Sequence, residues 1–264
     1  MTLVDKYGKW AIVTGASSGI GEEFARKLSS EGFNLIIIAR RKERLDNLAQ
    51  ELMSLYKVKI IPVKLDLTDD NFMNKLSEIT NDKEIGILVN NAGIGSTGEF
   101  VNVEAEHEIK MVKLNCLAPT ILTHHFVKGM KERRKGAIVF LGSVTAFQPT
   151  PMMAAYSATK VFNLFLGNSL WWELKKYNID VLSLNPGGTE TEFQRIADAE
   201  TGPIPRTTKQ VVETAMNALG KKPSVVDGTF NKLLTFSSRF VSQKLTVIIA
   251  GLIASRLYKN KSDR

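Results

Sequence analysis

A tyrosine, a lysine and a serine have the types and spacing needed to move a proton to or from a substrate oxygen. Tyr156 and Lys160 are four residues apart in a stretch with helical periodicity, which places them on one helix face. Ser143 lies thirteen residues before the tyrosine, at the end of an apolar segment. A free tyrosine has a pKa of about 10, and we expect the neighbouring ammonium and a cationic cofactor ring to lower it. The three side chains therefore predict general acid–base chemistry.

A glycine-rich turn near the N-terminus predicts a dinucleotide cofactor. Gly15, Gly19 and Gly21 follow an apolar segment at 10–14 and precede an amphipathic segment. Glycines so placed allow a tight turn and let a pyrophosphate approach a helix N-terminus, where free N–H groups favour negative charge.

Two arginines after the second apolar segment indicate which dinucleotide binds. An acidic residue at this position binds the 2′-hydroxyl of NAD, whereas arginine accommodates the 2′-phosphate of NADP. This chain has Arg40 and Arg41 there, and the first carboxylate is Glu43, inside the next predicted helix. Because guanidinium groups form charge-assisted hydrogen bonds with phosphate, the sequence predicts NADP(H).

The elements that must position these residues are short apolar segments alternating with longer amphipathic ones. The pattern predicts strands at 10–14, 34–38, 59–65, 85–89, 136–141 and 180–184, and helices at 22–31, 41–56, 71–79, 104–131 and 154–177. Continuous apolar strands separated by helices are typical of a parallel sheet covered on both faces. We predict a single α/β Rossmann domain with a doubly wound parallel sheet at 1–228, followed by a helical, basic C-terminal extension at 229–264.

Several motifs, in order, resemble the short-chain dehydrogenase/reductases over about residues 8–193. They are Thr14-Gly-x-x-x-Gly-x-Gly21, Asp66-Leu67, Asn90-Asn-Ala-Gly93, Asn115, Ser143, Tyr156-x-x-x-Lys160, and Pro186-Gly187 with Thr191. Within that family the chain resembles the 3-oxoacyl and ketosteroid reductases, and a hydroxy-amino-acid dehydrogenase branch is the alternative. A non-catalytic NADP-binding regulator on the same fold is a further alternative, although such proteins usually lack one of the three groups that this chain keeps.

The resemblance implies a role for each motif. Tyr156 would donate or accept the proton, Ser143 would hydrogen-bond to the same substrate oxygen, and Lys160 would hold the nicotinamide ribose and stabilise a tyrosinate. Asn115 would fix a helix kink and a water molecule behind Lys160. The residues implied in cofactor binding are Gly15, Ser17, Ser18, Gly19, Ile20, Gly21, Arg40, Arg41, Asp66, Leu67, Asn90, Ala92, Gly93, Tyr156, Lys160, Pro186, Gly187, Thr189 and Thr191. Thr189 departs from the family pattern, since many members carry an aliphatic residue there.

The segment after Ser143 and the loop after Gly187 are expected to contact the substrate. Their apolar residues are Val144, Phe147, Pro149, Pro151, Met152, Met153, Phe193 and Ile196. An adaptable apolar wall favours a lipid-like or bulky carbonyl compound. The loop at about 188–206 is the predicted substrate lid, and its acidic residues are Glu190, Glu192, Asp198 and Glu200.

Composition excludes several other classes of protein. The chain has 264 residues, of which 44% are hydrophobic and 23% charged, as in a soluble globular protein. The lone cysteine, Cys116, excludes a disulfide framework, and His107, His124 and His125 share no ligand spacing, so we expect no metal site. The net charge of +8 belongs to the tail, because residues 221–264 hold nine basic and two acidic residues. We therefore expect a cytoplasmic protein with a small-molecule substrate and no nucleic-acid partner.

The tail and two long helices carry expectations about larger partners. Near one helical stripe between 231 and 258 fall Leu234, Val241, Leu245, Ile248, Leu252 and Ile253, flanked by Lys232, Arg239, Lys244, Arg256, Lys259 and Lys261. A basic amphipathic helix too short to span a bilayer is typical of peripheral membrane contact, and packing on the body or across a dimer is the alternative. The helices at 104–131 and 154–177, the latter with Phe162, Phe165 and Trp172, predict a homodimer or homotetramer.

Overall fold

The structure is a computed structural model that describes residues 2–193, 197 and 204–262. Ile196, Asp198 and Glu200 lie outside the described residues, as do the middle of the predicted lid and the side chains of Arg239, Arg256, Lys259 and Lys261.

One parallel sheet forms the centre of the chain, with the strand order β3-β2-β1-β4-β5-β6-β7. Its strands are β1 (Trp10–Thr14), β2 (Asn34–Ala39), β3 (Ile60–Lys64), β4 (Ile85–Asn90), β5 (Gly136–Leu141), β6 (Ile179–Asn185) and β7 (Ser224–Val226). The order reverses between β1 and β4, which is where a doubly wound sheet opens a crevice for a ligand. The predicted fold class is confirmed. Sequence reasoning missed β7, which has three half-buried residues and so little periodicity to detect.

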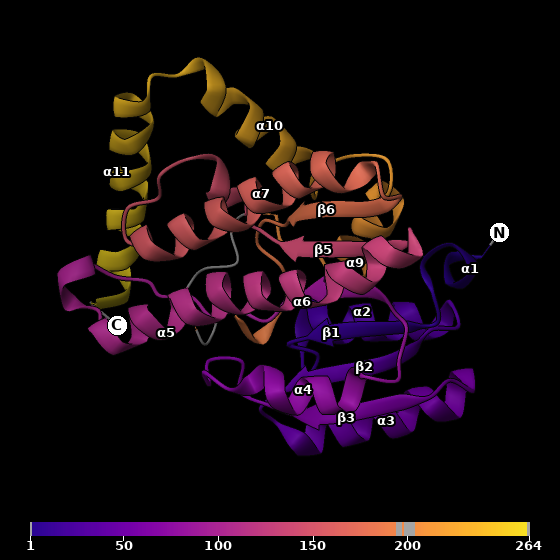
Figure 1. The fold of residues 1–264 in the computed structure, drawn as a ribbon. Coiled ribbons are helices and arrows are strands. Elements are labelled where there is room, and N and C mark those ends of the chain that lie inside the picture. Colours follow the sequence, from indigo (N-terminus) through magenta and orange to yellow (C-terminus); the bar gives the residue numbers. More distant parts are fainter. Residues whose placement is uncertain (1, 194–196, 198–203, 263–264) are drawn as a thin grey trace.

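Helices cover both faces of the sheet (Figure 1). They are α1 (Leu3–Tyr7), α2 (Gly19–Ser30), α3 (Lys42–Tyr56), α4 (Phe72–Thr80), α5 (Ala105–Val112), α6 (Ala118–Arg133), α7 (Ala154–Lys175), α9 (Thr208–Ala218), α10 (Thr229–Ser237) and α11 (Gln243–Ser262). The side chains of β1 alternate between two cores. Val13 packs with α2, α3 and α9 on one face, and Ile12 packs with α4, α6 and α7 on the other.

The predicted long helix at 104–131 is interrupted by a π-helical turn at Lys113–Leu117. Asn115 lies inside this turn with 1% of its surface exposed. Its amide donates to the carbonyl of Ile94 at 2.9 Å, and its Oδ1 accepts from the Ile94 N–H at 3.0 Å. A π-bulge lets a helical residue bond outside the helix, which is what Asn115 does with Ile94.

The C-terminal extension starts at Thr229, next to the predicted boundary, but it is not one continuous helix. A short 3-10 turn at Ser238–Phe240 separates α10 from α11. The expectation of a single helical stripe from 231 to 258 is therefore wrong, because the turn reorients the apolar residues that follow it. Figure 1 shows α10 and α11 as an arm that turns back beside the body. Among the described residues, no helix combines the length and apolar content that crossing a bilayer requires.

Candidate active site

A single cavity of about 1110 Å³ collects most of the predicted site residues at the strand ends. Its lining includes Gly15, Ser17, Ser18, Gly19, Ile20, Arg40, Arg41, Asp66, Leu67, Ala92, Gly93, Ser143, Tyr156, Lys160, Pro186, Gly187, Thr189 and Thr191. Gly21, Asn90 and Asn115 are not among the lining residues, and neither are Phe147 and the exposed Pro149 of the expected apolar wall. The sheet thus brings together residues that are far apart in the sequence.

The glycine turn has the backbone that a dinucleotide requires. Gly15 and Gly19 have φ of +68° and +62°, in the left-handed region that favours glycine. A Cβ at Gly21 would lie 2.3 Å from the carbonyl oxygen of Gly15, so a side chain there would force the turn apart. Ser18 is the N-cap residue of α2, yet its hydroxyl accepts from Arg41 at 2.7 Å instead of capping the helix. The N-terminal N–H groups of α2 therefore remain suited to an anion.

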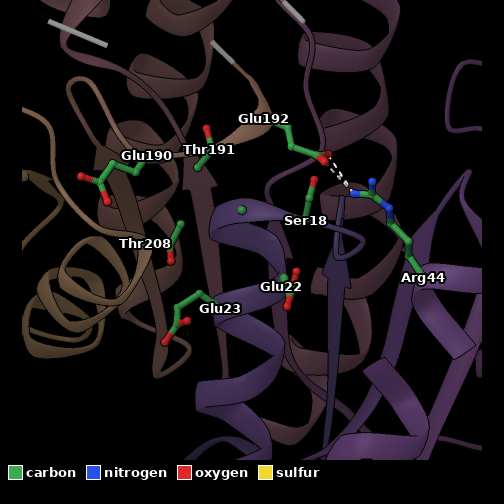
Figure 2. A pocket seen from close by; sticks show the side chains of 9 residues that line it. Ser18, Glu22, Glu23, Arg44, Glu190, Thr191, Glu192 and Thr208 are labelled. Carbon is green, nitrogen blue, oxygen red and sulfur yellow. Dashed lines mark hydrogen bonds and ion pairs between the residues drawn. The ribbon is translucent and has the colours of Figure 1, made fainter. Parts of the chain in front are cut away.

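Arg41, which follows β2, is hydrogen-bonded to this turn. The guanidinium of Arg41 donates to the hydroxyls of Ser17 at 2.9 Å and Ser18 at 2.7 Å. On its other side it donates to Glu192 at 2.7 Å, and Arg44 donates to both oxygens of the same carboxylate at 2.9 Å. Figure 2 shows Glu192 and Arg44 facing each other beside the start of α2. A positively charged corner with hydroxyl groups suits the 2′-phosphate of NADP(H).

Other predicted cofactor residues divide into lining and supporting groups. Leu67, Ala92 and Gly93 line the cavity directly, whereas the amide of buried Asn90 donates to Thr123 at 3.1 Å. Asn91, which sequence reasoning did not single out, donates to the Thr14 carbonyl at 2.8 Å and so ties the glycine turn to β4. Its position within the Asn90–Gly93 motif could have indicated this role.

The tyrosine, serine and lysine lie together at the middle of the cavity, each less than 9% exposed. The ammonium of Lys160 lies 5.5 Å from the centre of the Tyr156 ring and donates to the carbonyl of Leu141 at 3.0 Å. Burial lowers the pKa of Lys160 to about 8. Burial also raises the pKa of Tyr156 to about 12, against a smaller lowering by a hydrogen bond with Ser143. The expected lowering of the tyrosine pKa is therefore wrong for the protein groups alone, because desolvation of the phenolate outweighs them.

Cys116, next to Asn115, is not an activated thiol. Burial raises the pKa of its thiol to about 11, so the reactive thiolate form is disfavoured.

The loop after β6 fixes the other end of the cavity. Thr189 is buried and pairs with Arg206 in an isolated parallel bridge, while its hydroxyl donates to the Gly187 carbonyl at 3.1 Å. Arg206 in turn forms a 3.0 Å ion pair with the fully buried Asp227, just before α10. The unusual threonine is therefore accommodated at the base of the predicted lid.

Side chains of the tail complete the cavity, which sequence reasoning missed. Leu234 of α10 and Ala250, Ile253 and Ala254 of α11 line it next to Pro151 and Met153. Asn231 packs closely against Gly187, because a Cβ added at Gly187 would lie 2.4 Å from the Nδ2 of Asn231. The small residues Ala250, Gly251 and Ala254 in an otherwise bulky apolar run were the available signal for close packing.

The described residues contain no cluster of three or more histidine, cysteine, aspartate or glutamate side chains that could hold a metal ion.

The chain is similar in sequence and structure to known dehydrogenases. The family model for short chain dehydrogenases matches residues 9–201. A 7beta-hydroxysteroid dehydrogenase of Mediterraneibacter gnavus is 30% identical over 239 residues, which cover 88% of this chain and 90% of that protein. A short-chain dehydrogenase from Sphingobium yanoikuyae, solved in complex with NADPH, is 34% identical with a TM-score of 0.77, covering 83% of this chain and 87% of that one.

A further relative is much longer than this chain. Hydroxysteroid dehydrogenase-like protein 1 of Gallus gallus is 36% identical over 187 residues, covering 70% of this chain but 56% of that protein. The human form, 35% identical over the same length, is named inactive.

Proposed function

The chain belongs to the short-chain dehydrogenases, a family of oxidoreductases that act on CH–OH and carbonyl groups, and on that premise we propose that it transfers hydride between NADP(H) and a bulky apolar ketone or secondary alcohol. The continuity of one cavity carries this proposal. It runs from Arg41 and the glycine turn, past Tyr156, to the apolar side chains of the tail.

The proposal assigns each polar group at the centre of the cavity a step. A bound nicotinamide would supply or accept the hydride at the substrate carbon. Tyr156 would give its phenolic proton to the carbonyl oxygen during reduction, with Ser143 hydrogen-bonded to that oxygen. Lys160 would bind the ribose and place positive charge near the phenol. Burial raises the Tyr156 pKa to about 12, so the phenol carries its proton at neutral pH.

The apolar half of the cavity supports a large substrate. Val144, Met153 and Phe193 line it from the body, and Ile253 lines it from the tail. The ring of Phe193 lies 5.7 Å from that of Tyr156, so an apolar group held there would be next to the proton donor. Similarity to a hydroxysteroid dehydrogenase supports a steroid-sized carbonyl compound.

A substrate panel tests this function. The purified chain is assayed with NADPH or NADH against steroid ketones, a long-chain 3-oxoacyl thioester, bulky aryl ketones and small ketones. We expect turnover of the bulky apolar ketones with NADPH, and loss of this turnover in Tyr156→Phe. Faster oxidation of serine or a 3-hydroxy acid with NADP⁺ would favour the hydroxy-amino-acid dehydrogenase alternative. NADPH binding without turnover of any compound would favour the non-catalytic regulator, the alternative to which the inactive human relative gives some weight.

We further propose that the outer face of the tail contacts anionic membranes peripherally. Leu233, Phe240 and Leu252 are 67%, 75% and 61% exposed, and Lys232 of α10 and Lys244 of α11 are exposed as well. Apolar side chains flanked by basic ones are typical of interfacial helices. The full chain should co-sediment with phosphatidylserine vesicles at low salt, and the variant Leu233→Asp/Phe240→Asp should not. Equal sedimentation of both proteins would contradict this proposal.

We also propose a homodimer or homotetramer built on α5, α6 and α7. Phe165 and Trp172 of α7 are 65% and 74% exposed, and Ile109 of α5 is 59% exposed. Light scattering at micromolar concentration should give at least twice the mass of the chain, and Phe165→Glu/Trp172→Glu should reduce it. A native monomer would refute the assembly.

A further inference from the structure

Arg41, one of the two arginines expected to hold a phosphate, is already bound to a carboxylate of this chain, and so is the nearby Arg44. Arg41 reaches Glu192 at 2.7 Å, and Arg44 reaches both of its oxygens at 2.9 Å. The hydrogen bonds from Arg41, and then those from Arg44, hold the pKa of Glu192 at about 2. The carboxylate is therefore ionised throughout the physiological pH range.

Because of where these groups lie, the Glu192 carboxylate and a bound phosphate would compete for the same arginine side chains. Arg41 lines the cavity and also donates to the hydroxyls of Ser17 and Ser18, so turning away would cost it these hydrogen bonds. Glu192 lines the same cavity and comes from the loop after β6. A carboxylate and a phosphate monoester use the same N–H donors of a guanidinium group. They also repel each other, so a phosphate bound at Arg41 must displace Glu192 or bind less tightly beside it.

We propose that Glu192 is a specificity-determining residue for the dinucleotide: it competes with the 2′-phosphate for Arg41 and Arg44 and thereby reduces the preference for NADP(H) over NAD(H). This inference rests on the proposed NADP(H) function. An ionised carboxylate lowers affinity only for the ligand that carries the additional phosphate.

Displacement of Glu192 would also reach the substrate half of the cavity. The next residue, Phe193, lies 5.7 Å from Tyr156, ring centre to ring centre. Its Cζ lies 2.8 Å from where a Cβ at Gly95 would be, so the ring is closely packed on that loop. Movement of the Glu192 backbone therefore changes the wall beside the proton donor.

Binding of cofactor fragments tests the competition without any turnover. Calorimetry on the full chain would measure the dissociation constants of 2′,5′-ADP and 5′-AMP for the native protein, Glu192→Gln and Glu192→Ala. We expect each variant to bind 2′,5′-ADP on the order of tenfold more tightly, with 5′-AMP changed less than twofold. Glu190→Gln is the matched control, since Figure 2 shows Glu190 pointing away from Arg44 on the other side of α2. The control should leave both constants unchanged.

Three results separate the possible failures. A native chain that prefers 2′,5′-ADP, with unchanged preference in both Glu192 variants, overturns this inference alone. If neither the native chain nor the two Glu192 variants prefer 2′,5′-ADP, the NADP(H) assignment fails and this inference fails with it. Hydrogen exchange of the backbone amides tests whether Glu192 is displaced. Addition of 2′,5′-ADP should speed exchange at residues 189–193 of the native chain and leave it unchanged in Glu192→Gln. Slower exchange in the native chain would contradict the displacement of Glu192.

Discussion

The two halves of the cavity are built in different ways. The cofactor half consists of turns that leave fully buried strands, and Val13, Ile38 and Val89 below them have at most 1% of their surface exposed. The substrate half is closed by α10 and α11, whose Leu234 and Ile253 line the cavity and are still 43% and 56% exposed. Side chains with few neighbours are easier to replace or move. We infer that the sheet fixes where hydride transfer occurs, while a thin helical layer determines which substrate fits.

The largest effect is expected at the boundary between the two halves. Tyr156→Phe keeps the buried ring and removes only the transferable proton. Turnover of an accepted ketone should fall on the order of 10²–10⁴-fold, with the dissociation constant of NADPH unchanged. Stopped-flow reduction and NADPH fluorescence titration measure the two quantities. Near-native turnover would show that another group supplies the proton.

The burial of Lys160 should make the free energy of unfolding depend on pH. Lys160 has a pKa of about 8 in the folded chain against 10.5 as a free side chain, so the unfolded chain binds more protons between these values. The free energy of unfolding should therefore rise with pH from 8 to 10.5, by at most about 1.4 kcal/mol per pH unit. Lys160→Met removes this contribution. Urea unfolding of both proteins at pH 7.5 to 10 should show a difference that grows with pH in favour of the native chain, and a constant difference would contradict the buried lysine.

The cofactor half should respond to the loss of Arg41. Arg41→Ala removes donors to Ser17, Ser18 and any bound 2′-phosphate. Hydrogen bonds to charged groups contribute about 1.5–3 kcal/mol, so NADPH should bind about tenfold to a hundredfold more weakly. NADH binding should change less. If both cofactors weaken equally, Arg41 supports only the turn, and the same comparison in Arg40→Asp would then identify the selective residue.

The same contrast explains what could be predicted from the sequence. Gly15 and Arg41 could be placed because they come just after strands with a strong apolar pattern, and Tyr156 could be placed because it lies near the start of a long helix. The tail could not be placed, because the turn at Ser238–Phe240 contains no glycine or proline that would indicate it. Helical periodicity also does not show which part of the protein an apolar helix face packs against. The ion pairs of Glu192 join residues about 150 positions apart, and only the folded loop reveals them.

The smallest effect is expected in the tail, and it tests whether this layer determines substrate choice. Ala254 lines the cavity, so Ala254→Trp would fill space opposite Met153 without touching the glycine turn. We expect kcat/KM for the bulkiest accepted ketone to fall on the order of tenfold, while small ketones and the NADPH dissociation constant stay unchanged. Leu252→Trp adds the same ring at a position that is 61% exposed on the same helix, and it should leave kcat/KM as in the native chain. Equal losses for large and small ketones in Ala254→Trp would show that α11 supports the fold of the cavity without selecting its substrate, and the distinction between the two halves would then fail.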